Sequence, residues 1–243
     1  MKLIEITEAK AHAKLGSIPI IQVRSGKDMG SIADKTGKWS GEGIQTTTTK
    51  HKSGKIVKHT TLRGLHDPAA HWVDMCMHNA HNPYIPKYQN VKIYEQPSLF
   101  RGDTQYTMIS TCEQLFGSLE MRFLINNHAS RDMVLGLKLT REGAAEMERN
   151  CQSHPDWVEP KRHMAIKLGW LLEQLQIGHR SKSSTTNIAT FFADTNLIKA
   201  FELFAHMPER FHDIHGGNWM FRESDGHLVL NDPLVYRKEP KNT

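Results

Sequence analysis

The sequence predicts an α+β fold in which a strand-rich first part is followed by a mainly helical second part. Runs rich in β-branched residues between residues 39 and 60, and again between 91 and 110, predict strands. From about residue 140 to residue 207, apolar residues recur at three- and four-residue steps, the spacing of a buried helix face. Two short apolar segments near the carboxyl end predict a final hairpin.

The first expected element is a hairpin with glycines at its turn. Residues 39–44, followed by the run Thr46–Thr49, predict a strand, a glycine turn and a second strand, because β-branched side chains favour a pleated, half-buried surface. Gly41 and Gly43 lie where the turn is expected. An ordinary hairpin turn is the commoner explanation of two glycines one residue apart.

Three more strands are expected in the first part. Residues 55–60 alternate after a turn at Ser53 and Gly54. Residues 91–95 and 105–110 follow later in the chain, separated by polar, proline and glycine residues. The first part is therefore expected to form a sheet.

A helix is expected between these strands. Asp67 is placed to cap its first turn, and Pro68 takes the first helical position, where a missing N–H costs nothing. The pair Asn82-Pro83 ends the element. Its apolar face comprises Trp72, Val73, Cys76 and Met77.

Two helices are expected in the second part. One carries the apolar residues Met164, Leu168, Leu171, Leu172 and Leu175 and ends at Gly178. The other begins after Asp194 as N-cap, ends before Pro208 and carries Leu197, Ile198, Phe201, Phe204 and Ala205.

The candidate chemistry lies near the carboxyl end. Asp213 is followed five places on by Asn218, with Gly216 and Gly217 between them. Residues 219–221 and 228–230 predict a hairpin that ends at Asp232, with Ser224, Asp225 and Gly226 at its turn. An Asp, an Asn and a second Asp in this order form the pattern with which kinase-fold enzymes hold a substrate hydroxyl and magnesium.

Each residue type suits phosphoryl transfer. Asp213 would orient the attacking hydroxyl, while the amide oxygen of Asn218 and the carboxylate of Asp232 would hold Mg²⁺, a hard cation that prefers oxygen ligands. Simple turn capping is the alternative explanation of these residues. A zinc site is a third explanation, although no Cys lies nearby. Its candidate ligands are His212, Asp213, His215 and His227.

The string from Phe211 to Val235 resembles the small serine/threonine protein kinases made early in infection by T7-like bacteriophages. It is more distantly similar to aminoglycoside and choline phosphotransferases. In those relatives a His follows the catalytic Asp by two places and a Gly precedes the Asn, as His215 and Gly217 do here. The second Asp precedes Pro in the phage enzymes, as Asp232 does. The likeness covers about a tenth of the chain.

This resemblance implies one kinase-like domain over residues 1–243, with a β-rich N-lobe and a truncated, mainly helical C-lobe. The N-lobe would span about residues 15–112, the hinge 111–116 and the C-lobe 117–243. The implied cofactors are ATP and Mg²⁺, and the implied acceptor is a serine or threonine of host proteins in the cytoplasm. Small molecules are the alternative acceptors. A pseudokinase that binds nucleotide or a host partner is the alternative function.

A kinase needs a phosphate-contacting lysine with an acidic partner, and the first part offers candidates. The phage kinases have a similar apolar-apolar-Lys string at the position of Lys58, whereas Lys55 is its rival near the turn. Asp74 is the acid within the following helix that could pair with Lys58, and it is shorter than the usual Glu. If Asp74 points away, the protein would bind nucleotide without turning it over.

The remaining nucleotide contacts are inferred from order along the chain. Gly41 and Gly43 would lie over the phosphates. The stretch from Thr111 to Leu115 would be the hinge that meets adenine, with Glu113 and Leu115 as contacts. Only eleven residues follow Asp232, so we expect no activation segment.

Composition excludes several other classes. With 38% hydrophobic residues, a chain of 243 residues can bury a real core, so wholesale disorder is not expected. The three widely spaced cysteines predict reduced thiols.

No segment reaches the length of a membrane span, which predicts no membrane partner. The net charge of +5 attracts anions, but no nucleic-acid-binding signature accompanies it. Metal binding by Cys76, His78 and His81 is less expected than packing of the cysteine and exposure of the histidines.

Overall fold

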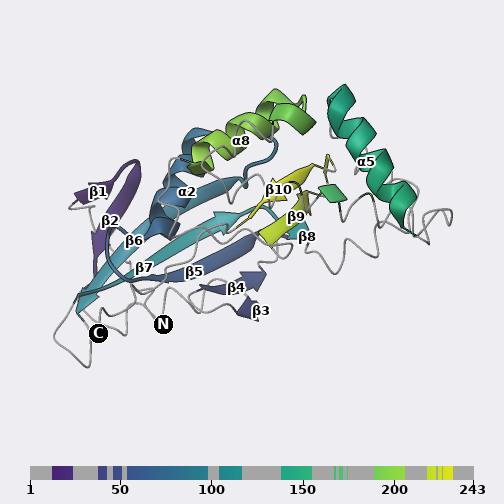
Figure 1. The fold of residues 1–243 in the computed structure, drawn as a ribbon. Helices are drawn as coiled ribbons and strands as arrows, with labels where there is room; N and C mark the ends of the chain where they lie inside the picture. Colours follow the sequence, from purple (N-terminus) through teal and green to yellow (C-terminus); the bar gives the residue numbers. More distant parts are fainter. Residues whose placement is uncertain are drawn as a thin grey trace, which may run out of the picture. The chain divides into compact units, whose positions relative to one another are not determined.

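A computed structural model of the 243-residue chain shows a mixed α and β protein that divides into two compact units. Unit 1 comprises Met1–Ala80 and Lys87–Gln114, and unit 2 comprises His81–Pro86 and Leu115–Thr243. The structure describes residues 13–23, 38–42, 46–50, 54–97, 104–116, 138–154, 167, 170, 171, 174, 189–205, 218–222, 224, 225 and 227–231. Unit 1 is built on a seven-stranded sheet, and unit 2 contains a three-stranded sheet and helices (Figure 1).

The sheet of unit 1 is mixed, with the order β1-β2-β6-β7-β5-β4-β3. All neighbouring pairs are antiparallel except β2 and β6, which run parallel. Its strands are β1 (Ala13–Leu15), β2 (Ile18–Gln22), β3 (Lys38–Glu42), β4 (Thr46–Lys50), β5 (Ile56–Leu62), β6 (Tyr88–Pro97) and β7 (Thr104–Cys112).

The strands expected around residues 39–49, 55–60, 91–95 and 105–110 are confirmed, most with somewhat different ends. The hairpin β1–β2 was not expected. It closes through a two-residue turn at Gly16 and Ser17, where Gly16 adopts φ +56°. Glycine reaches that left-handed conformation without steric cost. The hairpin was not predicted because the sequence around it lacks the strict alternation of apolar and polar residues that indicates strands.

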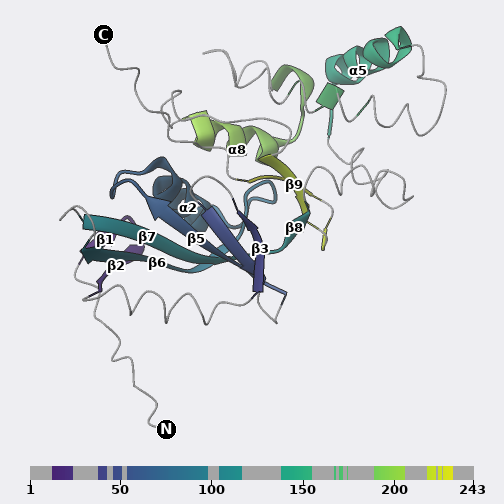
Figure 2. The same ribbon diagram turned by 90° about the horizontal axis from the view of Figure 1, so that it is seen from below.

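The helix α2 (Pro68–His78) packs against β1, β5 and β6. Figure 2 shows the helix beside the sheet of unit 1. Its start is as expected, because the Asp67 side chain accepts a hydrogen bond from the Ala69 N–H at 2.9 Å and Pro68 occupies the first turn. The helix ends earlier than expected, with Asn79 as its C-cap. The core of unit 1 includes the fully buried side chains of Ile18, Ile20, Trp72, Ile93 and Met108.

Unit 2 contains the helices α5 (Arg141–Ser153) and α8 (Thr195–Ala205). Thr140 caps α5 by accepting a hydrogen bond from the Gly143 N–H, and Asp194 caps α8 through the N–H groups of Asn196 and Leu197. The N-cap role expected for Asp194 is therefore confirmed. Within the other expected helix, the described residues Lys167, Trp170, Leu171 and Gln174 are helical.

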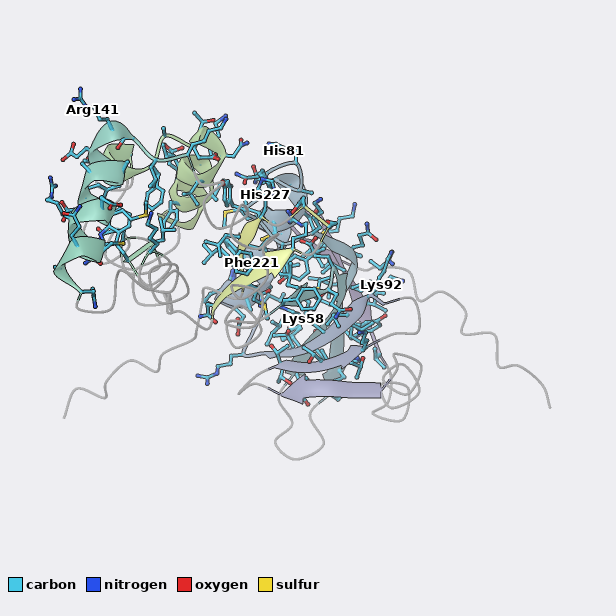
Figure 3. The ribbon with its side chains drawn as sticks, turned by 90° about the vertical axis from the view of Figure 1, so that its right-hand side faces the viewer. Lys58, His81, Lys92, Arg141, Phe221 and His227 are labelled. Carbon is cyan, nitrogen blue, oxygen red and sulfur yellow. The ribbon has the colours of Figure 1, made fainter. Side chains whose placement is uncertain are left out.

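The three-stranded sheet of unit 2 has the order β10-β9-β8. Its strands are β8 (Leu115–Phe116), β9 (Trp219–Arg222) and β10 (Leu228–Leu230). The expected carboxyl-end hairpin is confirmed: Phe221 pairs with Leu228 and Trp219 with Leu230. Figure 3 labels Phe221 and His227 on this hairpin.

Two further expectations concern the whole chain. Cys76, Cys112 and Cys151 are all buried and take part in no disulfide, which agrees with the expected reduced thiols. Among the helices that the structure describes, none combines the length and apolarity needed to cross a membrane.

Candidate functional site

The open end of the β9–β10 hairpin brings Asn218 beside Asn231. The Asn231 N–H donates a hydrogen bond to the Asn218 carbonyl at 2.8 Å, which extends the ladder one residue beyond the Trp219–Leu230 pair. Asn231 is buried, and Asp232 follows it in the sequence. Asp213 and Asp232 themselves lie outside the described residues. Asn218, expected as a magnesium ligand, is thus fixed at the hairpin end from which the chain leads to Asp232.

A segment of residues 81–86, which we call the strap, holds this hairpin against helix α8 within unit 2. The Leu230 N–H donates to the Tyr84 carbonyl at 2.9 Å. The Tyr84 hydroxyl donates to the Asp194 carboxylate at 2.7 Å, and the Asn82 amide donates to the Asn196 carbonyl at 2.8 Å. Burial, and then the hydrogen bond and negative charge of Asp194, raise the pKa of Tyr84 well above its usual range.

Arg222 fastens the strap from the hairpin side. Arg222 is 2% exposed, and its guanidinium donates to the carbonyls of Pro83 at 2.7 Å and Ile85 at 3.0 Å. It also pairs with Asp225 in the hairpin turn at 3.3 Å. Burial raises the pKa of Asp225, but the His227 N–H and the charges of Arg222 and His227 outweigh it, so the pKa lies below its ordinary value. The hairpin therefore has little freedom to shift against the strap.

Lys58 lies on β5 and is 7% exposed (Figure 3). Its ammonium is 3.5 Å from the Tyr88 hydroxyl and 5.7 Å from the centre of the Tyr88 ring. Its cross-strand neighbour Ser110 is also buried. The rival Lys55 is exposed and donates to the Gln89 side chain at 3.0 Å. A buried lysine among polar side chains is the feature expected of a functional cation, whereas Lys55 has the surroundings of an ordinary surface lysine.

Asp74 does not meet Lys58. One oxygen of its carboxylate accepts hydrogen bonds from the Ser17 N–H at 2.9 Å and the Ser17 hydroxyl at 2.6 Å, and His78 lies 3.8 Å away. The expectation that Asp74 pairs with Lys58 is therefore corrected. An aspartate on α2 has a short side chain, and the turn between β1 and β2 supplies two donors beside it.

The glycines and hinge residues fall as follows. Gly41 lies inside β3, paired with Thr48 beside an irregularity in register, so it is not in the turn where it was expected. Gly43 lies outside the described residues. Glu113 follows β7; its N–H donates to the Lys87 carbonyl at 3.3 Å, and its carboxylate accepts from the Lys87 N–H at 2.9 Å. Leu115 begins β8 and pairs with Arg222.

The metal alternatives find no support in the described part of the chain. There, no group of three or more His, Cys, Asp or Glu side chains is arranged to hold a metal. Cys76 is buried in α2, while His78 and His81 are exposed. The zinc candidates His212 and His215 lie outside the described residues, and His227 packs edge-on against Tyr84.

Sequence reasoning missed two participants, Tyr88 and the strap. Tyr88 begins β6 several residues before the expected strand, and its contact with Lys58 joins residues 30 apart. In the strap, Pro83 indicated only a helix end. The available signal was the burial-prone pair Tyr84-Ile85 between two prolines, which is unusual for an exposed loop.

Comparisons with known proteins place the chain in no group. No family model matches it, and neither the curated proteins nor the solved structures gave a significant match.

Proposed function

We propose that the protein is an ATP-dependent phosphotransferase with a kinase-like two-lobed fold, which transfers phosphate to serine or threonine residues of host proteins in the cytoplasm. Asp213 would orient the acceptor hydroxyl, and Lys58 would contact the nucleotide phosphates. Asn218 and Asp232 would hold Mg²⁺, which bound there would neutralise phosphate charge.

The contact between Asn231 and Asn218 is the observation that carries this proposal. A metal site needs ligands from the two strands of the hairpin to meet at one end. The 2.8 Å hydrogen bond joins the backbone at Asn218 to that of the residue before Asp232. The side chains of Asn218 and Asp232 both offer oxygen atoms, the ligands that magnesium prefers, so these two residues fit that ion. The hydrogen bonds from Arg222 to the strap restrain this hairpin, as a metal site built on it would require.

The arrangement in unit 1 adds a second line of support. Lys58 lies on β5, which is followed in the chain by α2, β6 and β7, and β7 pairs with both β5 and β6. A kinase requires a lysine strand followed by a helix, so the order of elements is compatible with that role. Burial distinguishes Lys58 from the exposed Lys55.

The transfer reaction tests the proposal directly. Purified protein is incubated with γ-labelled ATP, magnesium and a bacterial lysate, and labelled proteins are separated on a gel. We expect labelling that falls at least about a hundredfold in Asp213→Ala and Asp232→Ala, because alignment and charge neutralisation supply most of the rate. Asp225→Asn is the matched control, since it removes a carboxylate from the other end of the same hairpin. Equal labelling by all variants would defeat the proposal.

Nucleotide binding offers a separate test. ATP with magnesium should raise the melting temperature of the wild-type protein through preferential binding to the folded state. Lys58→Met should remove most of that rise, and Lys55→Met, which alters a lysine just before β5, should keep it. The opposite ranking of the two lysines would exclude Lys58 from the phosphate site.

Binding without transfer is the second candidate function. The engagement of the Asp74 carboxylate by Ser17 favours it, since Asp74 is then not the acid that pairs with Lys58, as the kinase interpretation expected. This candidate predicts thermal stabilisation by ATP and magnesium, together with no labelling of any lysate protein. Labelling that depends on Asp213 would eliminate it.

A further inference from the structure

The β-bulge in β6 determines which face of the sheet Tyr88 occupies. Gln89 pairs with Thr111 and Lys92 with Ile109, so three steps along β6 match two steps along β7. Asn90, inside this bulge, has φ +52°. One extra residue reverses the alternation of side chains between the two faces.

Without the bulge, Tyr88 would lie on the face opposite to Ile93, because five residues separate them. With the bulge, Tyr88 pairs with Cys112 while Ile93 pairs with Met108, and these two β7 residues share a face with Ser110. Ser110 is the cross-strand neighbour of Lys58. The bulge therefore turns Tyr88 onto the face that carries Lys58.

Tyr88 then restrains a flexible cation. A lysine ammonium on a four-carbon stem has many rotamers, and burying its charge is costly unless polar or π-electron partners surround it. Tyr88 is 5% exposed and offers both its hydroxyl, at 3.5 Å, and its ring face, with the centroid at 5.7 Å. Because that ring is packed, its position is defined, and so is the space left for the ammonium.

We propose that Tyr88 is a positioning residue of Lys58, whose contact fixes where the ammonium lies. This inference rests on the proposed function for its catalytic meaning, since Lys58 is taken as the phosphate-contacting group. The Tyr88 hydroxyl and ring face orient the ammonium through contacts that carry no formal negative charge of their own. Bulges commonly re-aim side chains beside functional sites, which agrees with this placement.

Lysine acetylation tests the contact without any reaction of the protein. The nucleotide-free wild type and its variants are treated briefly with N-hydroxysuccinimidyl acetate, and modified peptides are quantified by mass spectrometry. The exposed Lys92 serves as internal reference. Tyr88→Phe should raise the ratio of Lys58 acetylation to Lys92 acetylation about two- to fivefold, because the hydroxyl contact is lost. Tyr88→Leu should raise it about tenfold, because the ring contact is lost as well.

Tyr94→Phe is the matched control. Tyr94 lies on the same strand, but it pairs with Thr107, which also neighbours Thr61, so it occupies the other face. The control should leave the ratio unchanged. An unchanged ratio in both Tyr88 variants, or an equal rise in Tyr94→Phe, would overturn the inference.

Activity supplies the second readout. In Tyr88→Phe, kcat/KM for ATP should fall about two- to fivefold while the melting temperature stays within about 2 °C of the wild type. If the wild type transfers no phosphate, the proposed function fails, and the acetylation ratios still decide whether Tyr88 holds Lys58. If transfer occurs and the ratios do not respond to Tyr88, only the positioning role fails.

Discussion

The carboxylate of Asp74 accepts two hydrogen bonds from Ser17, at 2.9 Å from the N–H and at 2.6 Å from the hydroxyl. The contact ties helix α2 to the turn between β1 and β2, across 57 residues of sequence. It gives Asp74 a structural role where pairing with Lys58 was expected. The contact also makes the β1–β2 hairpin part of the support of α2.

A double-mutant cycle measures this contact. Ser17→Ala and Asp74→Ala should each lower the free energy of unfolding by about 1–2 kcal/mol, because hydrogen bonds to a charged acceptor are lost. The double variant should lose about 1 kcal/mol less than the sum, since both changes remove the same interaction. Urea unfolding gives the three values. Strict additivity would show that Ser17 and Asp74 do not stabilise each other.

Gly16→Ala should destabilise the protein by about 1–3 kcal/mol. The new Cβ would stand 2.1 Å from Asp74 Oδ2, and an L side chain is strained at φ +56°. In the Asp74→Ala background the cost should fall but not vanish, because the backbone strain persists. Gly64→Ala is the control within unit 1, since a Cβ there has nothing within 4 Å. Equal costs in the two backgrounds would mean that Asp74 moves aside freely.

Asn90 tests the bulge. Asn90→Gly should be tolerated, while Asn90→Val should cost at least about 1 kcal/mol, because a β-branched residue disfavours a positive φ. The valine variant should also raise acetylation of Lys58, since a disturbed bulge moves Tyr88. Thermal melts and peptide mass spectrometry provide the two measurements. A valine variant that is stable and unaltered at Lys58 would contradict the role given to the bulge.

Arg222→Met should lower the free energy of unfolding by about 2–4 kcal/mol, because one buried and one partly buried carbonyl of the strap lose their donor. Arg222→Lys should cost less, since lysine keeps the charge but cannot reach both carbonyls with a planar group. Arg149→Met is the control: Arg149 pairs with Glu146 on the exposed surface of α5, and its loss should stay within about 0.5 kcal/mol. Comparable losses at the two arginines would show that the strap does not depend on Arg222.

Tyr84 makes the stability of the protein depend on pH in the alkaline range. Its folded-state pKa is raised above the ordinary value of 10.0 by burial and by Asp194, so its stabilising contribution is complete below pH 10 and is lost as the pH rises further. Tyr84→Phe should be less stable than the wild type at pH 7, by about 1 kcal/mol, for want of the hydrogen bond to Asp194. The difference should shrink above pH 10. A constant difference from pH 7 to pH 11, measured by urea unfolding, would be inconsistent with this origin.

Local signals in the sequence were sufficient for several elements. Asp67 and Pro68 predicted the start of α2, and Asp194 predicted the cap of α8, because capping depends on a few adjacent residues. The carboxyl-end hairpin followed from two apolar runs and a turn. The register of this hairpin, which the sequence did not specify, places Asn218 opposite Asn231.

Other features were set by contacts between distant residues. One example is the parallel pairing of β2 with β6, and another is the attachment of the strap to unit 2. Both join segments that are far apart in the sequence and that no local sequence pattern relates. The partner of Asp74 depends on a turn 57 residues away, and a single extra residue in β6 decides which face Tyr88 occupies. The sequence by itself thus determined the helix starts and the hairpin strands, because these depend on residues that are adjacent along the chain. Tertiary structure alone decided which charged side chains meet, because packing and register act through space and leave no periodic trace in the sequence.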